Sequence, residues 1–558
     1  MEKILFIDNF YYSMDYLSGE NFFASLPDCV LPKGLLSIDA YIKKMCPGVE
    51  TEFEFMNLDL LTSLHKDNNL NKALREGSYD IKPKIDEIYE NIRQRIIEFK
   101  PSIIAISNLF DSTMVDLFKL ISWVRVVDKN VLLVAGGHAV SNLYIETFEN
   151  CPNMLDGIIL GEGEIPFVEL IKSENKRKYL EESPYVITCS KVKDGSYKKC
   201  RGTMIQDLDD IPIYDYLRVI NKYGEEALAC FGSRSHHDFK TLKQGSFLTS
   251  RGCPFRCTFC GSHSVHGRRV RANTYERIIE EINFWIDVID VDIITLYDDH
   301  VLYDVDRMIK LLDYVSERGK KLVFDNGLAI NCITQDFVDA LERNNIREVK
   351  LALESGSNKV LKNIMHKPLT IEIADKVFKM FENTKIYIIV FYVYGFIDET
   401  IDDINDTINY IKSVKYDWVS VHDLMPITGS EIYDKYLELG IIKKMDTKML
   451  VKYDYFIEHN FNKTGYKHFN YILNLDFNFV NNPNIKRKNY ELAKRQFESI
   501  TYFFPDHAFA YRYLHYCMKM LNYEDNELKM ISDKYYALIN DNEFWHYFLD
   551  HFELPYEI

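Results

Sequence analysis

Short apolar segments alternate with amphipathic, helix-like segments twice along this chain, and this alternation limits its fold more than any other feature. In the first block, residues 1 to about 175, five apolar runs have the length of β-strands. They are residues 4–7, 53–56, 103–107, 131–135 and 157–160. Strands that alternate with helices at this spacing form a parallel sheet that helices cover on both faces. The pattern therefore predicts an α/β, Rossmann-like domain.

A second block repeats the alternation between residue 245 and about residue 440. Its six strand-like runs are residues 247–249, 293–297, 322–324, 349–353, 387–394 and 418–424. Six βα units favour a partial barrel over a second open sheet, although periodicity alone does not choose between the two. The intervening residues, 176–240, are charge-rich and turn-prone, and we interpret them as a connecting segment.

The last segment, residues 441–558, has a different composition. About a third of the chain's aromatic residues fall in this fifth of its length, and residues 491–502 and 508–521 have helical patterns. These features predict a mainly helical, aromatic-rich C-terminal domain. Aromatic stripes usually form a core, but they also build substrate walls and partner surfaces. We expect this domain to shape the substrate pocket, with a purely structural role as the alternative.

Charge and hydropathy exclude several classes of protein. The 67 basic and 84 acidic residues give a formal net charge of −17, whereas duplex nucleic-acid binders usually carry a basic excess. No apolar run approaches the roughly 20 residues that span a bilayer. The first residues enter a strand-like run without the layout of a signal peptide. We therefore expect a cytoplasmic protein with no nucleic-acid partner and no membrane span.

Three of the eleven cysteines are crowded into one short loop, as Cys253, Cys257 and Cys260. Because glycine and proline keep this loop irregular, three thiolates can converge on one metal centre. A structural zinc site normally has four ligands, and His263 or His266 would have to supply the fourth. The alternative is an iron–sulfur cubane held by three cysteines, which leaves one iron open to a substrate or cofactor.

This loop, placed after the first strand of six βα units, resembles that of the radical S-adenosylmethionine (SAM) superfamily. Further landmarks follow in that family's order, at residues 268–271, 297–299, 353–357, 395–400 and 426–430. The resemblance implies a radical SAM partial barrel at residues 241–440, with a [4Fe–4S] cluster on the three cysteines. It implies that SAM is bound by Phe259, Asp298, Asp299, Glu354, Ser355 and Gly395. No catalytic residue is assigned beyond the cluster ligands.

The first block resembles the cobalamin-binding domain that is fused to one branch of this superfamily. The resemblance rests on residues 31–36, 107–108, 136–138 and 161–164. It implies that cobalamin is bound in residues 1–175 by Leu35, Ser107, Asn108, Gly136, Gly137, His138, Gly161, Glu162 and Gly163. The sequence Asp-x-His-x-x-Gly, which supplies a histidine to cobalt in many cobalamin proteins, is absent. We therefore expect no protein histidine on cobalt.

The two resemblances together imply an enzyme that cleaves SAM reductively to a 5′-deoxyadenosyl radical. Its expected reaction is methylation of an unactivated carbon in a natural-product, peptide or lipid substrate, with flavodoxin or ferredoxin as the kind of electron donor. One alternative is a radical cyclisation, rearrangement or oxidation without methyl transfer. Another is a non-catalytic cluster or zinc protein. A gain of one methylene in the product separates the first two reactions.

Replacing Cys253, Cys257 and Cys260 together by alanine should abolish the brown chromophore and all formation of 5′-deoxyadenosine. The reason is that no other cysteines in the chain are close enough in sequence to form such a loop. Iron analysis and chromatography of the reconstituted triple variant check this. A full complement of four irons in that variant would contradict the assignment.

Overall fold

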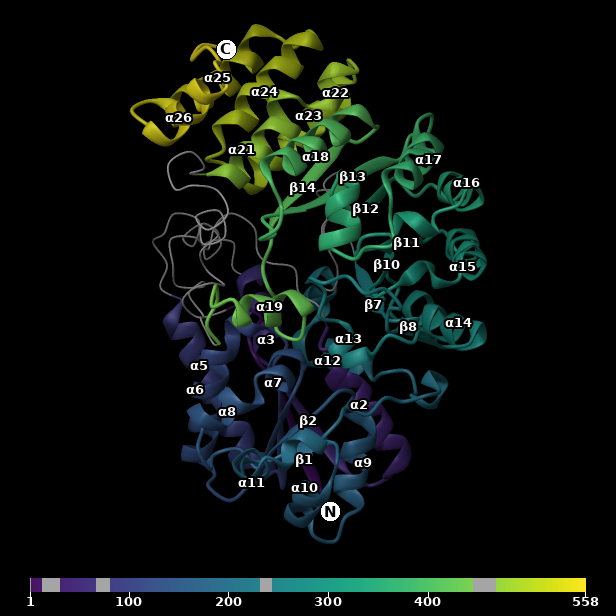
Figure 1. The fold of residues 1–558 in the computed structure, drawn as a ribbon, viewed down its shortest axis with the longest axis vertical. Helices are drawn as coiled ribbons and strands as arrows, with labels where there is room; N and C mark the ends of the chain where they lie inside the picture. Colours follow the sequence, from purple (N-terminus) through teal and green to yellow (C-terminus); the bar gives the residue numbers. More distant parts are fainter. Residues whose placement is uncertain (1, 13–30, 67–80, 231–242, 445–467) are drawn as a thin grey trace.

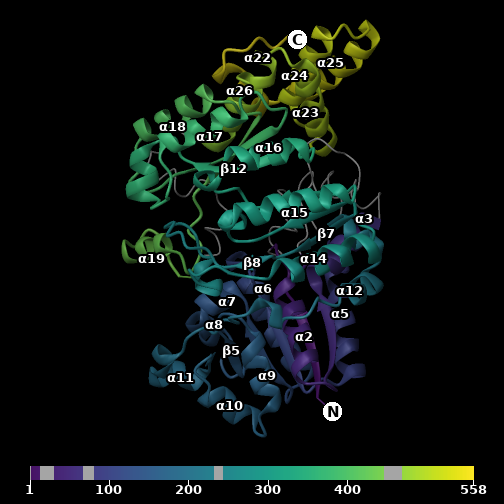
Figure 2. The same ribbon diagram turned by 90° about the vertical axis from the view of Figure 1, so that its right-hand side faces the viewer.

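The computed structural model describes residues 2–12, 31–66, 81–230, 243–444 and 468–558. Its two α/β blocks and its helical C-terminal part follow one another along the long axis of the molecule (Figures 1 and 2). The predicted fold class is confirmed. Among the described residues, no helix combines the length and the apolar character needed to cross a membrane.

The N-terminal sheet has the strand order β2-β1-β3-β4-β5-β6, and its first five strands are parallel. They are β1 (Lys3–Asp8), β2 (Glu50–Phe55), β3 (Ile103–Ser107), β4 (Leu132–Gly136) and β5 (Gly157–Ile159). Their side chains are almost all buried, as expected for a parallel sheet covered on both faces. The covering helices α2 (Lys33–Met45) and α9 (Glu164–Lys172) pack together on one side. Helices α5 (Lys82–Phe99) and α6 (Met114–Val127) lie on the other (Figure 1).

The segment at residues 176–240 is more than a connection between domains. After α10 (Lys176–Glu182), the strand β6 (Val186–Ile187) pairs antiparallel with β5 and becomes the edge of the N-terminal sheet. Farther along, Thr203 forms a bridge with Gly161, and α12 (Tyr216–Tyr223) packs against α3 (Met56–Lys66). The N-terminal domain therefore continues past residue 175. A two-residue strand is too short to give a periodic signal in the sequence.

The second block forms a partial barrel of six parallel strands in sequence order. They are β7 (Gln244–Phe247), β10 (Ile293–Leu296), β11 (Lys321–Phe324), β12 (Glu348–Glu354), β13 (Tyr387–Tyr394) and β14 (Trp418–Asp423). Hydrogen bonds from Leu328 N to Lys350 O (2.7 Å) and from Ala352 N to Leu328 O (3.1 Å) join the two halves. The outer helices are α14 (Tyr275–Asn283), α15 (Val305–Glu317), α16 (Gln335–Arg343), α17 (Ile371–Phe381) and α18 (Ile401–Ser413).

The first barrel strand lies earlier in the sequence than predicted. It ends at Phe247 instead of beginning there, and Ser250–Arg251 forms a separate short strand, β8, that pairs antiparallel with β9 (Arg271–Ala272). The strand β7 reads Gln-Gly-Ser-Phe, and its polar and small residues give no apolar pattern that predicts a strand. Gly245 is required in it, because an added Cβ would lie 2.5 Å from the ring of Trp285.

The described C-terminal residues form a helical unit with a core of its own. Its elements are α21 (Phe469–Leu475), the π-helix η9 (Asp476–Val480), α22 (Pro483–Lys486), α23 (Tyr490–Phe503), α24 (Ala508–Met520), α25 (Asp525–Ile539) and α26 (Glu543–His551). Phe479, Phe497, Phe509 and Phe548 are buried together in this core. Much of the aromatic excess is therefore structural, as the core interpretation predicts. The start of α21 reaches the barrel, where the ring of Phe469 lies 5.2 Å from that of Tyr394.

The C-terminal unit also covers the exposed edge of the partial barrel. Val419 N on the edge strand β14 donates to Asn478 Oδ1 (2.8 Å), and Asn478 Nδ2 donates to Val419 O (2.9 Å). The Asn478 side chain is fully buried, so one amide group takes the place of a neighbouring strand. Uncovered strand edges expose unpaired backbone groups that can pair with other chains. The helical unit therefore covers the β14 edge of the barrel at Val419.

Replacing Asn478 by alanine should lower the free energy of unfolding by roughly 2 kcal/mol or more, because a buried N–H and a buried C=O both lose their partner. Denaturant unfolding followed by tryptophan fluorescence measures this, since Trp418 lies next to Val419 on β14. The control is Asn540→Ala, at an exposed position on the same unit. Equal stability of the two variants would contradict the proposed edge-covering role.

Candidate functional site

A cavity of about 340 Å³ opens where the carboxyl ends of β3, β4 and β5 face the barrel. This volume lies in the range of small-molecule and cofactor sites, and ligands of parallel α/β sheets bind at this end of the strands. The N-terminal domain contributes the loops after these strands and the start of α2. The barrel contributes Leu248, Arg251, Ser262, Val265, His266, Tyr297 and Asp299. One cavity is therefore shared between the two α/β domains.

Eight of the nine residues predicted to bind cobalamin line this cavity. They are Leu35, Ser107, Gly136, Gly137, His138, Gly161, Glu162 and Gly163. Asn108 instead is buried in the domain, where its Oδ1 accepts hydrogen bonds from Asn9 Nδ2 (2.7 Å) and Thr113 Oγ1 (2.9 Å). It holds the loop after β3 in place.

Two of the cavity glycines cannot be replaced without strain. Gly137 has φ +103°, and an added Cβ would lie 2.5 Å from Asn108 O. Gly161 has φ +67°, and its Cβ would lie 2.9 Å from Thr203 O. Each glycine lets its loop pass close to another backbone segment, and this fixes the loops after β4 and β5 that line the cavity. The cavity is lined mainly by apolar groups, which suits a large cofactor such as cobalamin.

The three crowded cysteines lie on an irregular, half-buried loop that begins directly after β8. Thr258, between the second and third cysteines, anchors this loop to the barrel. Its N donates to Met365 O (2.9 Å) and its Oγ1 to Ile364 O (2.8 Å). Arg268 Nη1 donates to Phe255 O (2.6 Å) from the other side. The cysteines are therefore presented on a fixed backbone.

The electrostatics of this loop suit a metal cluster. Burial raises the pKa of Cys253 to about 11 and also raises the pKa of Cys257, and the neighbouring cysteines add to both shifts. The Cys253 and Cys257 thiols therefore resist deprotonation unless a metal binds the thiolates. Within the described ranges, no three His, Cys, Asp or Glu side chains converge on a single ion. Three cysteines on one loop fit a cubane, in which three irons would each take one cysteine and the fourth would stay open.

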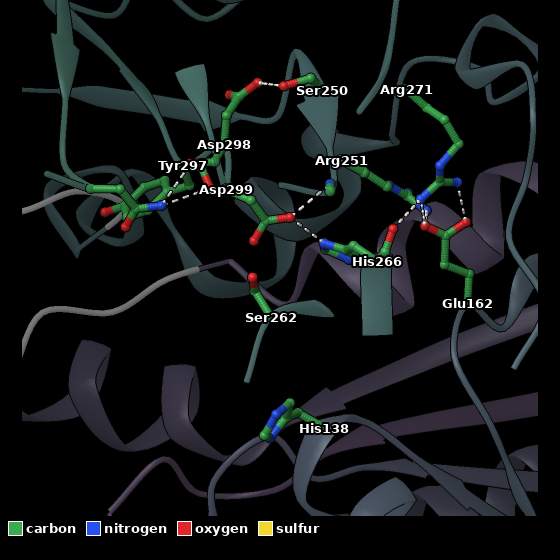
Figure 3. A network of polar contacts seen from close by, with 12 residues as sticks. His138, Glu162, Ser250, Arg251, Ser262, His266, Arg271, Tyr297, Asp298 and Asp299 are labelled. Carbon is green, nitrogen blue, oxygen red and sulfur yellow. Dashed lines mark hydrogen bonds and ion pairs between the residues drawn. The ribbon is translucent and has the colours of Figure 1, made fainter. Parts of the chain in front are cut away.

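The two aspartates predicted to contact SAM have different surroundings, as Figure 3 shows. Asp298 is buried and accepts hydrogen bonds from Thr249 N, Thr249 Oγ1 and Ser250 Oγ. Burial raises its pKa despite these donors. Asp299 lines the cavity and accepts from Gly252 N (2.8 Å) and from His266 Nδ1 (2.9 Å). Asp298 thus fixes the chain after β7, whereas Asp299 faces the shared site.

Among the other predicted SAM residues, Glu354 interacts electrostatically with the cysteine loop. It ends β12 with φ +69°, its carboxylate is 3.6 Å from Lys367 Nζ, and both groups influence the pKa of Cys257. The ring of Phe259 lies 6.1 Å from that of Phe396. The positive φ of Glu354 is uncommon for a non-glycine residue, and such strained residues cluster at functional sites.

Ser355 and Gly395 form hydrogen bonds inside the barrel domain. Ser355 Oγ is 3.0 Å from Thr407 Oγ1, and Gly395, with φ +97°, donates its N–H to Glu399 Oε2 (2.7 Å). Burial raises the pKa of Glu399 to about 7. These contacts shape the turns after β12 and β13.

The sequence predicted no role for Arg251 or Arg271, although residues 268–271 belonged to the recognised pattern, and His266 was considered only as a zinc ligand. In the structure both arginines bind the glutamates of the loop Gly161-Glu-Gly-Glu164, and Arg271 Nη2 donates to Glu162 Oε1 (2.6 Å). The signal available in the sequence was two arginines flanking the cysteines and two glutamates in a glycine loop. No local sequence pattern predicts that these arginines and glutamates, which lie about a hundred positions apart, form ion pairs.

Comparisons with known proteins agree with this geometry. A model of the radical SAM superfamily matches residues 247–411, and a model of the B12 binding domain matches residues 68–171. An uncharacterized methyltransferase, PH0819 of Pyrococcus horikoshii, is 24% identical over 371 residues, 66% of this chain and 76% of that protein. Cytidylyl-2-hydroxyethylphosphonate methyltransferase of Streptomyces wedmorensis is 22% identical over 448 residues, 75% of this chain and 80% of that protein.

A solved structure shares the overall architecture. The radical SAM methyltransferase TsrM from Kitasatospora setae, with cobalamin and a [4Fe–4S] cluster bound, matches with a TM-score of 0.56 and 12% identity. The match covers 79% of this chain and 78% of that one, and at this identity the likeness concerns the fold. Both domain matches confirm the resemblance found in the sequence. The chain therefore contains a radical SAM domain with a B12-binding domain ahead of it.

Proposed function

We propose that this enzyme is a cobalamin-dependent methyltransferase that acts on an unactivated carbon of a natural-product, peptide or lipid substrate. The observation that carries the proposal is the cavity shared by the two domains. The carboxyl ends of β3, β4 and β5 line it on one side, and residues beside the cysteine loop line it on the other. Two relatives named as methyltransferases cover most of the chain and support the same reaction.

The residues have separate tasks in this proposal. Cys253, Cys257 and Cys260 would hold the cluster, and the glycine loops at Gly137 and Gly161 would pack against cobalamin. When bound, the cluster supplies the electron that cleaves SAM to a 5′-deoxyadenosyl radical, and cobalamin serves as the methyl carrier.

The protein itself contributes position and shielding. The cavity is walled by apolar side chains such as Leu31, Leu35 and Ile38, which keep water from the reacting groups. Asp299 is held in one orientation by Gly252 N and His266. We place it against the polar end of SAM, together with Glu354. A one-electron donor such as flavodoxin or ferredoxin completes the system.

Incubating the reconstituted enzyme anaerobically with SAM labelled in its methyl group should transfer that label to one metabolite or peptide from a host extract. The expected product gains one labelled methyl in place of hydrogen. High-resolution mass spectrometry detects it, and the triple cysteine variant is the control. A product of unchanged mass, or one that has lost two hydrogens, would contradict methylation and would support the rearrangement or oxidation alternative.

No protein histidine should coordinate cobalt. His138 lines the cavity, but its Nε2 lies 3.3 Å from Gly261 O and must donate its proton there, so this nitrogen has no lone pair for cobalt. The expectation rests on the absence of Asp-x-His-x-x-Gly, the sequence that supplies a histidine to cobalt in many cobalamin proteins. Electron paramagnetic resonance of the cobalt(II) form should therefore be the same in wild type and His138→Gln. A nitrogen splitting that this substitution removes would refute the expectation.

A further inference from the structure

The loop after β5, which lines the cofactor cavity, is bound to the barrel by buried charges. Glu162 Oε2 and Oε1 accept hydrogen bonds from Arg271 Nη1 (2.8 Å) and Nη2 (2.6 Å), and Arg251 Nη1 is 3.4 Å from Glu162 Oε1. Arg251 Nη1 also donates to Glu164 Oε1 (2.9 Å). All four side chains are at most 7% exposed. Figure 3 shows Glu162 with both arginines.

The carboxylate of Glu162 is fully engaged by protein donors. In addition to the arginines, Ile205 N donates to its Oε2 (2.8 Å). Neither oxygen therefore points freely into the cavity. The flanking glycines, Gly161 and Gly163, offer the contact surface of this loop instead. This changes the role expected for Glu162 from the sequence, which was a direct contact to cobalamin.

Both arginines lead directly to the cysteine loop. Arg251 stands two residues before Cys253, and Arg271 Nη2 donates to His266 O (3.1 Å). The ring of His266 then bonds Asp299, which accepts from the N–H of Gly252. Hydrogen bonds through Arg271, His266 and Asp299 thus link Glu162 to Gly252, the residue before the first cysteine. Figure 3 shows the part from Glu162 to Asp299.

The other end of the cysteine loop is held by the second glycine loop of the cavity. His138 Nε2 bonds the carbonyl of Gly261, the residue after Cys260. On the same short helix, α7 (His138–Asn142), Asn142 Nδ2 donates to Ser264 Oγ (3.2 Å). An added Cβ on Gly261 would lie 2.7 Å from His138 Nε2, so this contact is close.

The ion pairs of Glu162 do not tolerate small displacements of the loop after β5 relative to the barrel. Taking charges out of water is costly and is offset only while the pair keeps good geometry. A displacement of the loop after β5 must therefore either carry Arg251 and Arg271 with it or break a buried charged pair. Ligands on the two sides of this contact then influence each other through a common element, as energetic coupling requires.

We propose that Glu162 is a positioning residue that couples the cobalamin cavity to the cysteine loop, so that cobalamin and SAM bind cooperatively. This inference rests on the proposed function for the identity of the two ligands. The coupling is positive, because both ligands meet at one interdomain cavity and the first to bind fixes the arrangement that the second requires. By linkage, each ligand changes the affinity of the other by the same factor.

The test is a thermodynamic cycle on the cluster-reconstituted enzyme, kept anaerobic and without reductant so that no turnover occurs. The Kd of aquacobalamin is measured with and without SAM, and the Kd of SAM with and without aquacobalamin. In wild type each ligand should tighten the other about 5-fold or more. In Glu162→Gln, which keeps the size of the side chain and removes its charge, this factor should fall below about 2.

Asp156→Asn is the matched control. Asp156 is also a little-exposed carboxylate of the N-terminal domain that binds an arginine, with Arg125 Nη2 at 2.8 Å, but it lies away from the cysteine loop along the chain and outside the cavity lining. This variant should keep the wild-type coupling factor. If Glu162→Gln does not fold, Arg271→Lys replaces it, since lysine keeps the charge and loses the two-pronged contact.

A second readout follows the cluster itself. The electron paramagnetic resonance spectrum of the reduced cluster with SAM should change when cobalamin is added to wild type, and should change less in Glu162→Gln. The proposal is overturned if wild type shows a coupling factor of one, or if Glu162→Gln keeps the full factor. Loss of all cobalamin binding in Glu162→Gln would also overturn it, since that result indicates a direct contact. Failure of methylation with coupling intact would contradict the proposed function alone.

Discussion

The structure depends on a property of parallel sheets: all their strand-to-helix loops on the carboxyl side emerge at one edge. This chain contains two such edges, and they face each other across one cavity. Loops from β3, β4 and β5 meet the loops that follow β7, β8 and β10. The chemistry of the protein is therefore concentrated where no regular element lies, while the regular elements supply rigidity. As a result, glycine-containing loops lie on the side of the N-terminal domain, and the cysteine loop lies on the side of the barrel.

The meeting of the two edges is stabilised by unlike means on its two sides. On the β5 side the contact is ionic and buried, with Glu162 and Glu164 opposite Arg251 and Arg271. On the β4 side it is made of single neutral hydrogen bonds through His138 and Asn142. Breaking the ion pairs leaves buried charges without partners, which costs far more free energy than breaking the neutral hydrogen bonds. The ionic side therefore sets the distance between the domains.

Elements with a strong local signal were predictable from the sequence. The α23 and α24 helices agree with the predicted ranges 491–502 and 508–521 to within one residue at each end, and the side chain of His507 caps the start of α24. The cysteine loop and the cavity glycines were found because their spacing is local. The first barrel strand was misplaced, since its Gln-Gly-Ser start lacks apolar residues and Gly245 is explained only by its contact with Trp285. The Glu162 pairs were missed because their partners are 89 and 109 positions away.

The return of the chain to the first sheet after α10 has a consequence for synthesis on the ribosome. The strand β6 and the bridge of Thr203 to Gly161 come from residues 186–203, so the N-terminal domain lacks its last sheet edge until these residues have emerged. Domains fold as units during synthesis, at about 5–20 residues per second. The edge of β5 thus stays unpaired until residues 186–203 have been synthesised and have emerged. Translational pauses just before residue 203 would prolong the exposure of this unpaired edge.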